Sequence, residues 1–259
     1  MFSSGAGSAI AAKRVAERHG VEHLTLLFAD VNGEHGDNYR FLREAAAWVG
    51  GELVVLDNGG KTIWQVFSEV RLLGNHRIDP CSRVLKREPL RRWLEKERSP
   101  ADTVVHLGFD WTESHRLDRA RPHWEPWTVE APLCWERPLD KAQALDMLRD
   151  AGILPPWLTR MGFPHANCGG GCVKAGIKHF RRLLDVAPAE YAWWEWNEER
   201  LRQQLGDVAI LTDRSGGRSG ADRRPMSLRE LRERNVTGPS LFDEDDWGGC
   251  NCFTPVEVA

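Results

Sequence analysis

Short apolar runs alternate with longer amphipathic stretches through the first half of the chain. The runs at residues 24–29, 52–56 and 104–109 are each bounded by polar residues or glycine, which is typical of buried β-strands. The stretches at residues 9–19 and 37–49 have the pattern of helices. This alternation predicts βαβ units and therefore a parallel sheet flanked by helices.

The second half of the chain has a helical pattern. Helices are predicted over residues 173–185, which are rich in Lys and Arg, around residues 191–196, and over residues 228–234, where Ser227 and Glu230 form a capping box. We therefore predict a nucleotide-binding α/β domain at residues 1–163 and a helical, cysteine-bearing region at residues 164–259.

Composition places the chain among ordinary soluble proteins. Hydrophobic residues make up 41% and charged residues 28% of the 259 residues, as in globular domains generally. The net charge of −3 gives no global reason to expect nucleic acid or an anionic membrane as a partner. No apolar run approaches the roughly 18–20 residues of a membrane-spanning helix, so we expect a cytoplasmic protein without a membrane partner.

A glycine-rich turn carries two cysteines, Cys168 and Cys172, within residues 164–176. Glycine permits backbone angles that let both sulfur atoms point to one place, and thiolates on tight turns hold metals and iron–sulfur clusters. The alternative is a pair of buried cysteines beside a glycine-rich loop.

The remaining cysteines decide between these interpretations. Cys81 follows a proline at the start of a basic helix, where the helix dipole lowers the pKa of a thiol, and Cys134 resembles a core cysteine. Cys250 and Cys252 lie in the tail. In a reducing compartment such cysteines serve metals or catalysis more often than disulfides. A four-thiolate iron–sulfur or zinc site is therefore predicted from Cys81, Cys168, Cys172 and one tail cysteine.

Candidate anion-binding groups lie near the predicted sheet. A Gly/Ser stretch opens the first helix and consists of Ser3, Ser4, Gly5, Ala6, Gly7 and Ser8. Free N–H groups at a helix N-terminus suit phosphate or sulfate, although a flexible start with an N-cap has the same pattern. Asp30 ends the first strand, on the side of a parallel sheet where ligands bind. Arg83 and Lys86 either form a solvated helix face or hold a phosphate.

The order of these motifs resembles the phosphoadenylyl-sulfate (PAPS) and adenylyl-sulfate reductase family, in the adenine nucleotide α-hydrolase-like superfamily. Ser3–Ser8 is similar to the family's modified pyrophosphatase loop, and Leu27–Asp30 to its strand-end aspartate segment. Cys81–Leu90 resembles the family's cysteine-plus-basic element, and Gly108–Arg119 corresponds to its Arg-rich Glu-Ser motif. The resemblance covers roughly residues 3–176 and ends at the pair Cys168 and Cys172.

This resemblance implies a sulfonucleotide reductase. An adenine nucleotide or sulfonucleotide would bind at Ser3–Ser8 with Asp30, Arg83, Lys86 and Arg116. A 4Fe–4S cluster would be held by Cys81, Cys168, Cys172 and Cys250. Cys252 would be the redox-active nucleophile, with a thiol or another electron donor completing the cycle; in the alternative assignment Cys252 is the ligand and Cys250 the nucleophile.

The chain also departs from the family pattern. Ala6 and Gly7 replace the lysine and aspartate of the standard ATP-pyrophosphatase loop, the cysteine pair is C-x-x-x-C rather than C-x-x-C, and only Met1 and Phe2 stand where the fold expects a strand. Two alternatives follow. One is a cluster-dependent sulfurtransferase that modifies a nucleic acid, which would face the basic residues at 174–182 and 214–224. The other is a non-catalytic zinc- and nucleotide-binding protein. The oligomeric state is open.

Overall fold

The computed structural model describes residues 1–213, 223–236 and 247. Its first half contains a series of short parallel strands with helices between them, as predicted. These elements are α1 (Ala6–His19), η1 (Val21–His23), β1 (Thr25–Ala29), α2 (Gly36–Val49), β2 (Glu52–Leu56), α3 (Ile63–Val70), α4 (Pro80–Ser82), the short π-helix η2 (Arg83–Arg87), α5 (Glu88–Glu97), β3 (Val104–His106), η3 (Trp111–Glu113), α6 (Ser114–Trp124) and β4 (Thr128–Glu130).

The second half is mostly helical. Its elements are η4 (Pro132–Cys134), α7 (Lys141–Asp150), α8 (Trp157–Arg160), η5 (Cys168–Gly170), α9 (Ile177–Val186), α10 (Pro188–Leu205), the strands β5 (Leu211–Asp213) and β6 (Arg224–Met226), and α11 (Leu228–Val236). The chain is therefore a mixed α/β protein with small parallel sheets, which confirms the α/β class predicted from the apolar pattern.

The parallel strands form two separate pairs. Strand β1 pairs with β2, with Leu27 opposite Val54, and β3 pairs with β4, with Val105 opposite Val129. Within the described residues no ladder of hydrogen bonds joins β1 to β3. The predicted third strand, residues 104–109, ends at His106 in the structure.

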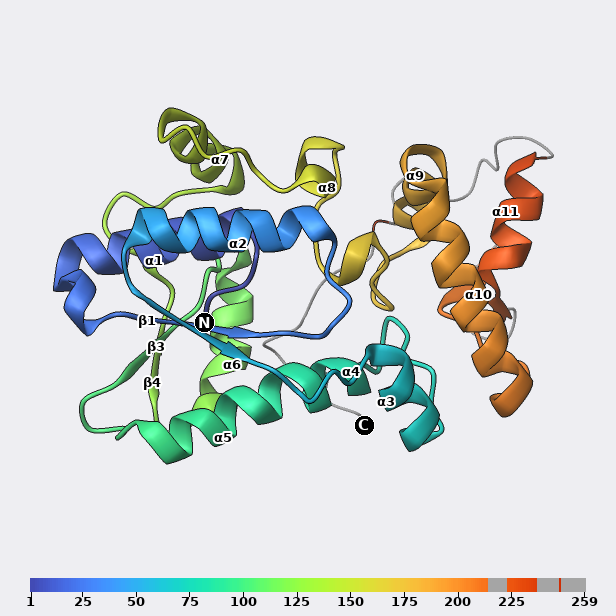
Figure 1. Cartoon of the computed structure of the whole chain (residues 1–259), viewed down its shortest axis with the longest axis horizontal. Helices are drawn as coiled ribbons and strands as arrows, with labels where there is room; N and C mark the ends of the chain where they lie inside the picture. Colours follow the sequence, from blue (N-terminus) through green and yellow to red (C-terminus); the bar gives the residue numbers. More distant parts are fainter. Residues whose placement is uncertain (214–222, 237–246, 248–259) are drawn as a thin grey trace.

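Strand β1 is buried on both faces. Leu26 and Phe28 pack in one apolar cluster with α1, α2 and α7, whereas Leu27 and Ala29 pack in another with α5, α6 and β3. Figure 1 shows α1 and α2 on one side of the strands and α5 on the other. A strand covered on both faces is a nearly continuous apolar run, which explains why residues 24–29 could be recognised in the sequence.

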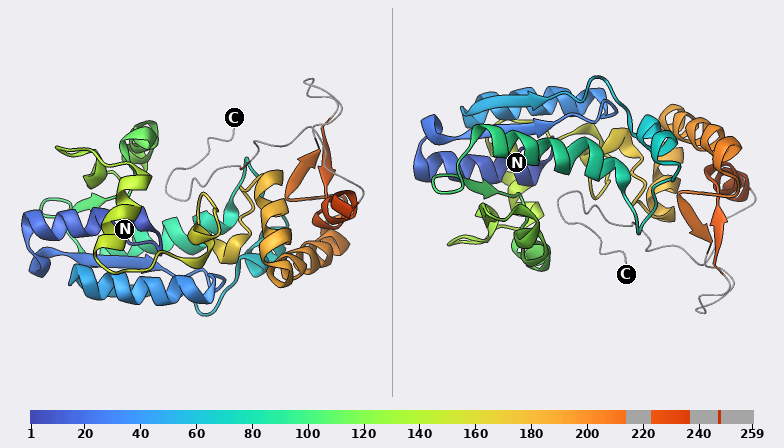
Figure 2. Two further views of the ribbon diagram at one scale, coloured as in Figure 1. Left: turned by 90° about the horizontal axis from the view of Figure 1, so that it is seen from above. Right: turned by 90° about the horizontal axis from the view of Figure 1, so that it is seen from below.

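Three helices of the second half lie at the other end of the molecule, whereas α7 packs beside α1. Helices α9, α10 and α11 lie together there with the hairpin β5–β6 (Figures 1 and 2). Their buried cluster contains Phe180 and Trp194, and also Phe67 and Leu85 from the first half of the chain. One core thus includes residues from both sides of the predicted boundary at residue 163.

Helix α9 begins later than the sequence predicts, whereas helix α11 begins at the predicted residue. Helix α9 begins at Ile177, later than the predicted start at residue 173, because the Cys172–Gly176 segment turns, with Ala175 N–H donating to Cys172 O at 2.8 Å. Helix α11 begins as predicted, with Glu230 N–H donating to Ser227 Oγ at 3.1 Å. No helix in the described part of the chain is both long and apolar enough to cross a membrane.

Candidate functional site

A cavity of about 410 Å³ lies at the N-terminus of α1. Segments far apart in the sequence line it. They are the loop at residues 1–8, η2 through Lys86, the segment from Leu107 to Arg116, η4 through Leu133, α7 through Lys141 and Ala144, α8 through Thr159, and residues 164–167. The cavity is large enough for a small-molecule ligand.

The Ser3–Ser8 loop supplies unpaired backbone donors to this cavity. Gly5 is the N-cap of α1 and makes no side-chain capping bond. Among the described residues, no hydrogen bond reaches the N–H groups of Ala6, Gly7 and Ser8. The first turn carries no acidic residue, so the positive end of the helix dipole is uncompensated. This geometry suits an anion.

Close backbone contacts hold the loop in place. A Cβ on Gly7 would lie 2.8 Å from Gly108 O, and a Cβ on Gly108 would lie 2.7 Å from Ser8 N. Ser8 Oγ is bonded to the carbonyls of Ser3 and Gly5, the latter at 2.9 Å. Glycine at both contact positions is therefore required for the loop to pack against the end of β3.

Three cations line the cavity. Lys86 is buried and lies 3.5 Å from the carboxylate of Glu34, whose side chain is also buried. The guanidinium of Arg116 pairs with Glu113 and stacks 4.4 Å from the Phe109 ring. Its Nε is buried and has no hydrogen-bond partner in the part of the chain that the structure describes. Lys141 donates to Pro164 O. Partial desolvation lowers the pKa of Lys141.

A histidine completes the lining. Both ring nitrogens of His165 are shielded from solvent and have no hydrogen-bond partner among the described residues. Its ring stacks on His179 with centroids 4.9 Å apart, and His179 Nε2 lies 2.7 Å from Gly170 O. Burial, and then the nearby His179, lower the pKa of His165 to about 3. His165 is therefore a neutral imidazole with one donor and one acceptor that no described residue satisfies.

The structure brings together most of the residues predicted for nucleotide binding. Ser3, Gly5, Ala6, Gly7, Ser8, Lys86 and Arg116 line the cavity, and Ser4 lies in the same loop. Asp30 and Arg83 lie outside both the cavity and the loop. Asp30 accepts hydrogen bonds from Asn32 N–H and the Tyr39 hydroxyl, at 2.8 and 2.7 Å, and exposed Arg83 pairs with Glu88 at 2.9 Å. Both of these make local structural contacts.

Two cavity residues were not singled out from the sequence. Lys141 lies in a helix with ordinary polar spacing, and His165 stands three residues before Cys168. Neither belongs to a motif with its own spacing, so only the fold brings them to the loop. The proximity of His165 to the Cys168–Cys172 turn was the one available signal.

Three of the predicted metal ligands share one buried environment. Cys81, Cys168 and Cys172 belong to the same apolar cluster, and no disulfide joins any two of the described cysteines. Cys168 and Gly169 have left-handed backbone angles, with φ of 54° and 64°. Lys174 N–H lies 3.5 Å from Cys172 Sγ. The fourth predicted ligand, Cys250, and the predicted nucleophile, Cys252, lie outside the described residues.

The described part of the chain holds no group of three His, Cys, Asp or Glu side chains placed to bind a metal. The surroundings nevertheless suit a negatively charged thiolate site. The ammonium of Lys174 is buried, makes no hydrogen bond within the described residues and lies 3.8 Å from the carboxylate of Asp79. A buried cation beside thiolates would offset their charge. Thiol side chains are suitable ligands for zinc or an iron–sulfur cluster, and these three cysteines need a further ligand to complete such a site.

Cys134 differs from the other three. It is partly buried against the cluster around β3 and β4, and its Sγ lies 3.7 Å from Phe109 O. Desolvation, then Asp110 and Glu113, raise the pKa of its thiol. This is the packed, unreactive cysteine that the sequence predicts at this position.

Comparisons with protein-family models, with curated proteins and with solved structures found no match to this chain.

Proposed function

We infer that the chain is an enzyme that binds an adenine nucleotide carrying a sulfate or phosphate in the cavity at the N-terminus of α1. The observation that supports this most directly is the meeting of unpaired loop N–H groups with Lys86, Arg116, Lys141 and His165 around one space. The order of the sequence motifs adds the resemblance to PAPS and adenylyl-sulfate reductases, with an adenine nucleotide α-hydrolase-like fold.

The residues of the cavity have distinct roles in this proposal. The N–H groups of Ala6, Gly7 and Ser8 hold anionic oxygens of the ligand. Arg116 and Lys141 add charge-assisted hydrogen bonds. His165 remains neutral and donates or accepts one hydrogen bond without adding charge. Together they stabilise negative charge on the leaving nucleotide.

The proposed reaction transfers a sulfo group from the sulfonucleotide to a cysteine. The Cys252 thiolate attacks the sulfur, the S–O bond to the phosphate breaks, and the nucleotide leaves with that electron pair. A second thiol then attacks the sulfur of Cys252, sulfite leaves, and a disulfide forms. The two electrons gained by sulfur come from the two thiols.

Cys81, Cys168, Cys172 and Cys250 are the residues that would hold a 4Fe–4S cluster, which would supply charge and redox capacity near the reacting sulfur when bound. Anaerobic purification should yield about four irons and four sulfides per chain. Replacing Cys168 with serine should abolish this content, and replacing Cys134 should not. Zinc at one atom per chain, without iron, would instead support the binding-protein alternative.

Nucleotide titration tests the central proposal. Adenosine 5′-phosphosulfate and its 3′-phosphorylated form should bind to the purified, cluster-intact protein in calorimetry and should yield sulfite with a dithiol. Lys141→Gln should weaken binding about tenfold, the value of one charge-assisted contact. Arg83→Gln is the matched control, because Arg83 lies outside the cavity. Equal affinities for both variants and the native chain would contradict the assignment of the site.

Two exposed tryptophans favour a second candidate function. On α10, Tyr191 and Trp194 are buried, but Trp193 and Trp196 are 44% and 55% exposed, and Arg200 lies 4.6 Å from the Trp196 ring. Exposed aromatic rings beside cations can stack on unpaired bases. Salt-dependent binding of tRNA or single-stranded DNA that Trp196→Ala weakens would favour a nucleic-acid sulfurtransferase over a reductase.

A further inference from the structure

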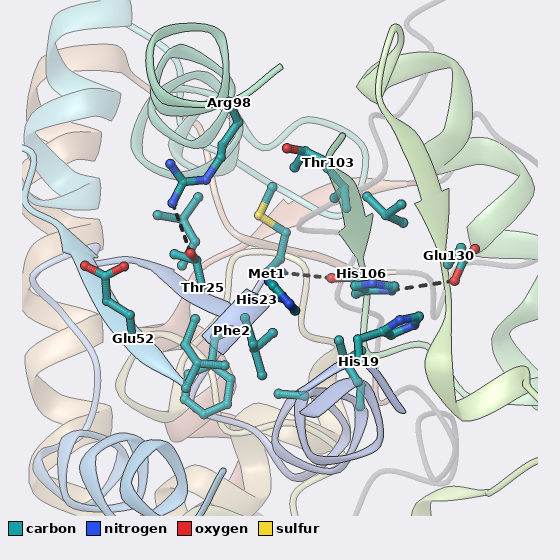
Figure 3. Close-up of a pocket in the computed structure, with 18 of the residues that line it drawn as sticks. Met1, Phe2, His19, His23, Thr25, Glu52, Arg98, Thr103, His106 and Glu130 are labelled. Carbon is teal, nitrogen blue, oxygen red and sulfur yellow. Dashed lines mark hydrogen bonds and ion pairs between the residues drawn. The ribbon is translucent and has the colours of Figure 1, made fainter. Parts of the chain in front are cut away.

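A second cavity, of about 790 Å³, separates the two parallel strand pairs. Strand β1 forms one wall and β3 the other, and Met1 lies between them (Figure 3). The cavity is also lined by apolar side chains of α1, among them Ala12 and Val15, and by Trp93 and Leu94 of α5. It therefore has the surroundings of a central strand in a sheet covered by helices on both faces.

The backbone edges on both sides of this cavity are open. Leu24 O accepts from Glu52 N–H and Asp30 N–H donates to Leu56 O, so the even-numbered residues of this segment face β2. Successive residues of a strand point their backbone groups in opposite directions, so Thr25 and Leu27 face the cavity. Leu107 N–H donates to Glu130 O, which by the same alternation turns Val104 and His106 toward the cavity.

The first two residues already pair with both edges. Phe2 N–H donates to Leu27 O at 2.8 Å, and the Met1 amine donates to His106 O at 2.8 Å. Donation by consecutive residues to opposite sides is the hydrogen-bonding pattern of a strand held between two parallel neighbours. Met1 and Phe2 thus occupy the positions of the last two residues of such a strand.

We propose that the cavity between β1 and β3 is the seat of a parallel β-strand of about five residues, whose last residue is joined to Met1. Its final residue would donate to Thr25 O and accept from Leu27 N–H. The residue before it would donate to Val104 O and accept from His106 N–H. Its side chains would alternate between α1 and α5 and would be apolar on both faces.

The chemistry of the Met1 amine agrees with this seat. Burial lowers the pKa of the amine to about 5, which reflects the cost of placing a chargeable group there. A peptide N–H at the same place would make the bond to His106 O without any charge. The strand would join the two pairs into one five-stranded sheet and would anchor the start of the Ser3–Ser8 loop. The proposal is independent of the ligand that the loop binds.

Extending the chain tests this seat directly. The native chain is compared with a variant in which the segment Lys-Val-Val-Ile-Val-Val precedes Met1. Amide exchange at Leu27 and His106 should slow by about tenfold or more in the extended chain, because both N–H groups gain a strand partner. The unfolding midpoint should rise by about 5 °C.

A matched control carries proline at the two positions directly before Met1, which removes both new backbone donors. It should show neither effect. If the extension prevents folding, the same segment is added as a free peptide to the native chain, and protection of Leu27 and His106 is measured there. Unchanged exchange at both amides would overturn the proposal.

The identity of the occupant needs a separate measurement. The intact mass of the protein isolated from its own cells should show residues joined to Met1, and native mass spectrometry should show that the extended chain is no more associated than the native chain. A mass that begins at Met1, or protection that accompanies dimer formation, would contradict a strand supplied by the same chain.

Discussion

At the scale of one residue, substitution of His165 should lower ligand affinity without lowering the stability of the fold. Its two ring nitrogens are buried without partners among the described residues, so the folded protein gains no internal hydrogen bond from them. An unsatisfied buried polar group costs about 1–3 kcal/mol. His165→Phe should therefore leave the unfolding midpoint unchanged or raise it, while ligand affinity falls by about tenfold. Thermal unfolding and calorimetric titration of the same preparation measure both.

His179 provides the contrast, because it stacks on His165 but bonds to Gly170 O. His179→Phe removes both the bond to Gly170 O and a buried Nδ1 that has no partner among the described residues, and it should leave affinity close to native because His179 does not line the cavity. If His165→Phe instead destabilises the protein and leaves affinity intact, His165 is a packing residue and has no ligand contact.

Gly108 tests how the loop is held. An alanine Cβ there would lie 2.7 Å from Ser8 N and 2.8 Å from Gly7 C, so the loop would have to move. Gly108→Ala should destabilise the fold by about 1–3 kcal/mol and weaken ligand binding, because the N–H groups of the loop would be displaced. The measurements are denaturant unfolding and titration.

Gly36 is the matched position for this substitution. It begins α2, and no atom of the described residues lies within 4 Å of the Cβ that alanine would add. Gly36→Ala should leave ligand binding unchanged and stabilise the protein by up to about 1 kcal/mol. Equal effects of the two substitutions would show that the loop does not depend on its contact with Gly108.

At the scale of elements, the helices and strands that the apolar pattern predicted are present, whereas β4, α6, α7 and the hairpin β5–β6 were not predicted. Residues 24–29 and 52–56 were recognisable because such strands are nearly continuous apolar runs. The strand at 104–109 was predicted too long, because Leu107 N–H makes the last bond to β4, at Glu130 O, and Phe109 is buried beyond the end of that pairing. Apolar periodicity reports burial, and it does not report hydrogen-bond pairing.

The candidate site could be predicted only in part. Motif order placed the Ser3–Ser8 loop, Lys86 and Arg116 near one another, because each belongs to a recognisable local pattern. Arg83 has the same charge and neighbourhood as Lys86 in sequence, but its position on η2 directs it to Glu88 and solvent. Lys141 and His165 reach the cavity through tertiary packing alone, for which the sequence has no local signal.

Glu198 joins three elements of the C-terminal region. Glu198 lies on α10, and each of its carboxylate oxygens accepts one backbone hydrogen bond. The donors are Ile210 N–H, just before β5, at 2.9 Å, and Leu228 N–H, at the start of α11, at 2.6 Å. Glu198→Ala should cost about 3 kcal/mol or more, because two buried N–H groups lose their partner. Glu198→Gln keeps one acceptor and should cost less. Chemical denaturation orders the three proteins, and an alanine variant as stable as the native chain would contradict this role.

At the scale of the whole molecule, buried titratable groups set how stability depends on pH. Burial lowers the pKa of His106 to about 4 and that of His179 to about 4, as it lowers that of His165 to about 3. In the unfolded chain these imidazoles bind protons near pH 6.5. Between pH 6.5 and 4 the unfolded state therefore holds more protons, and acidification favours unfolding. The Met1 amine acts in the same direction between pH 8 and 5, since its folded pKa is about 5.

Glu198 opposes this trend. Desolvation raises the pKa of its carboxyl to about 7, so between pH 7 and 4.5 the folded state holds the extra proton and acidification stabilises it. Three histidines outweigh one carboxyl, at no more than about 1.4 kcal/mol per pH unit for each group. The unfolding midpoint should therefore fall as pH is lowered from 6.5 to 4.5. Glu198→Gln should make the fall steeper by removing the opposing group, and His165→Phe should make it shallower. A midpoint that stays constant or rises over this range in the native chain would show that these imidazoles are solvated and accept protons in the folded state.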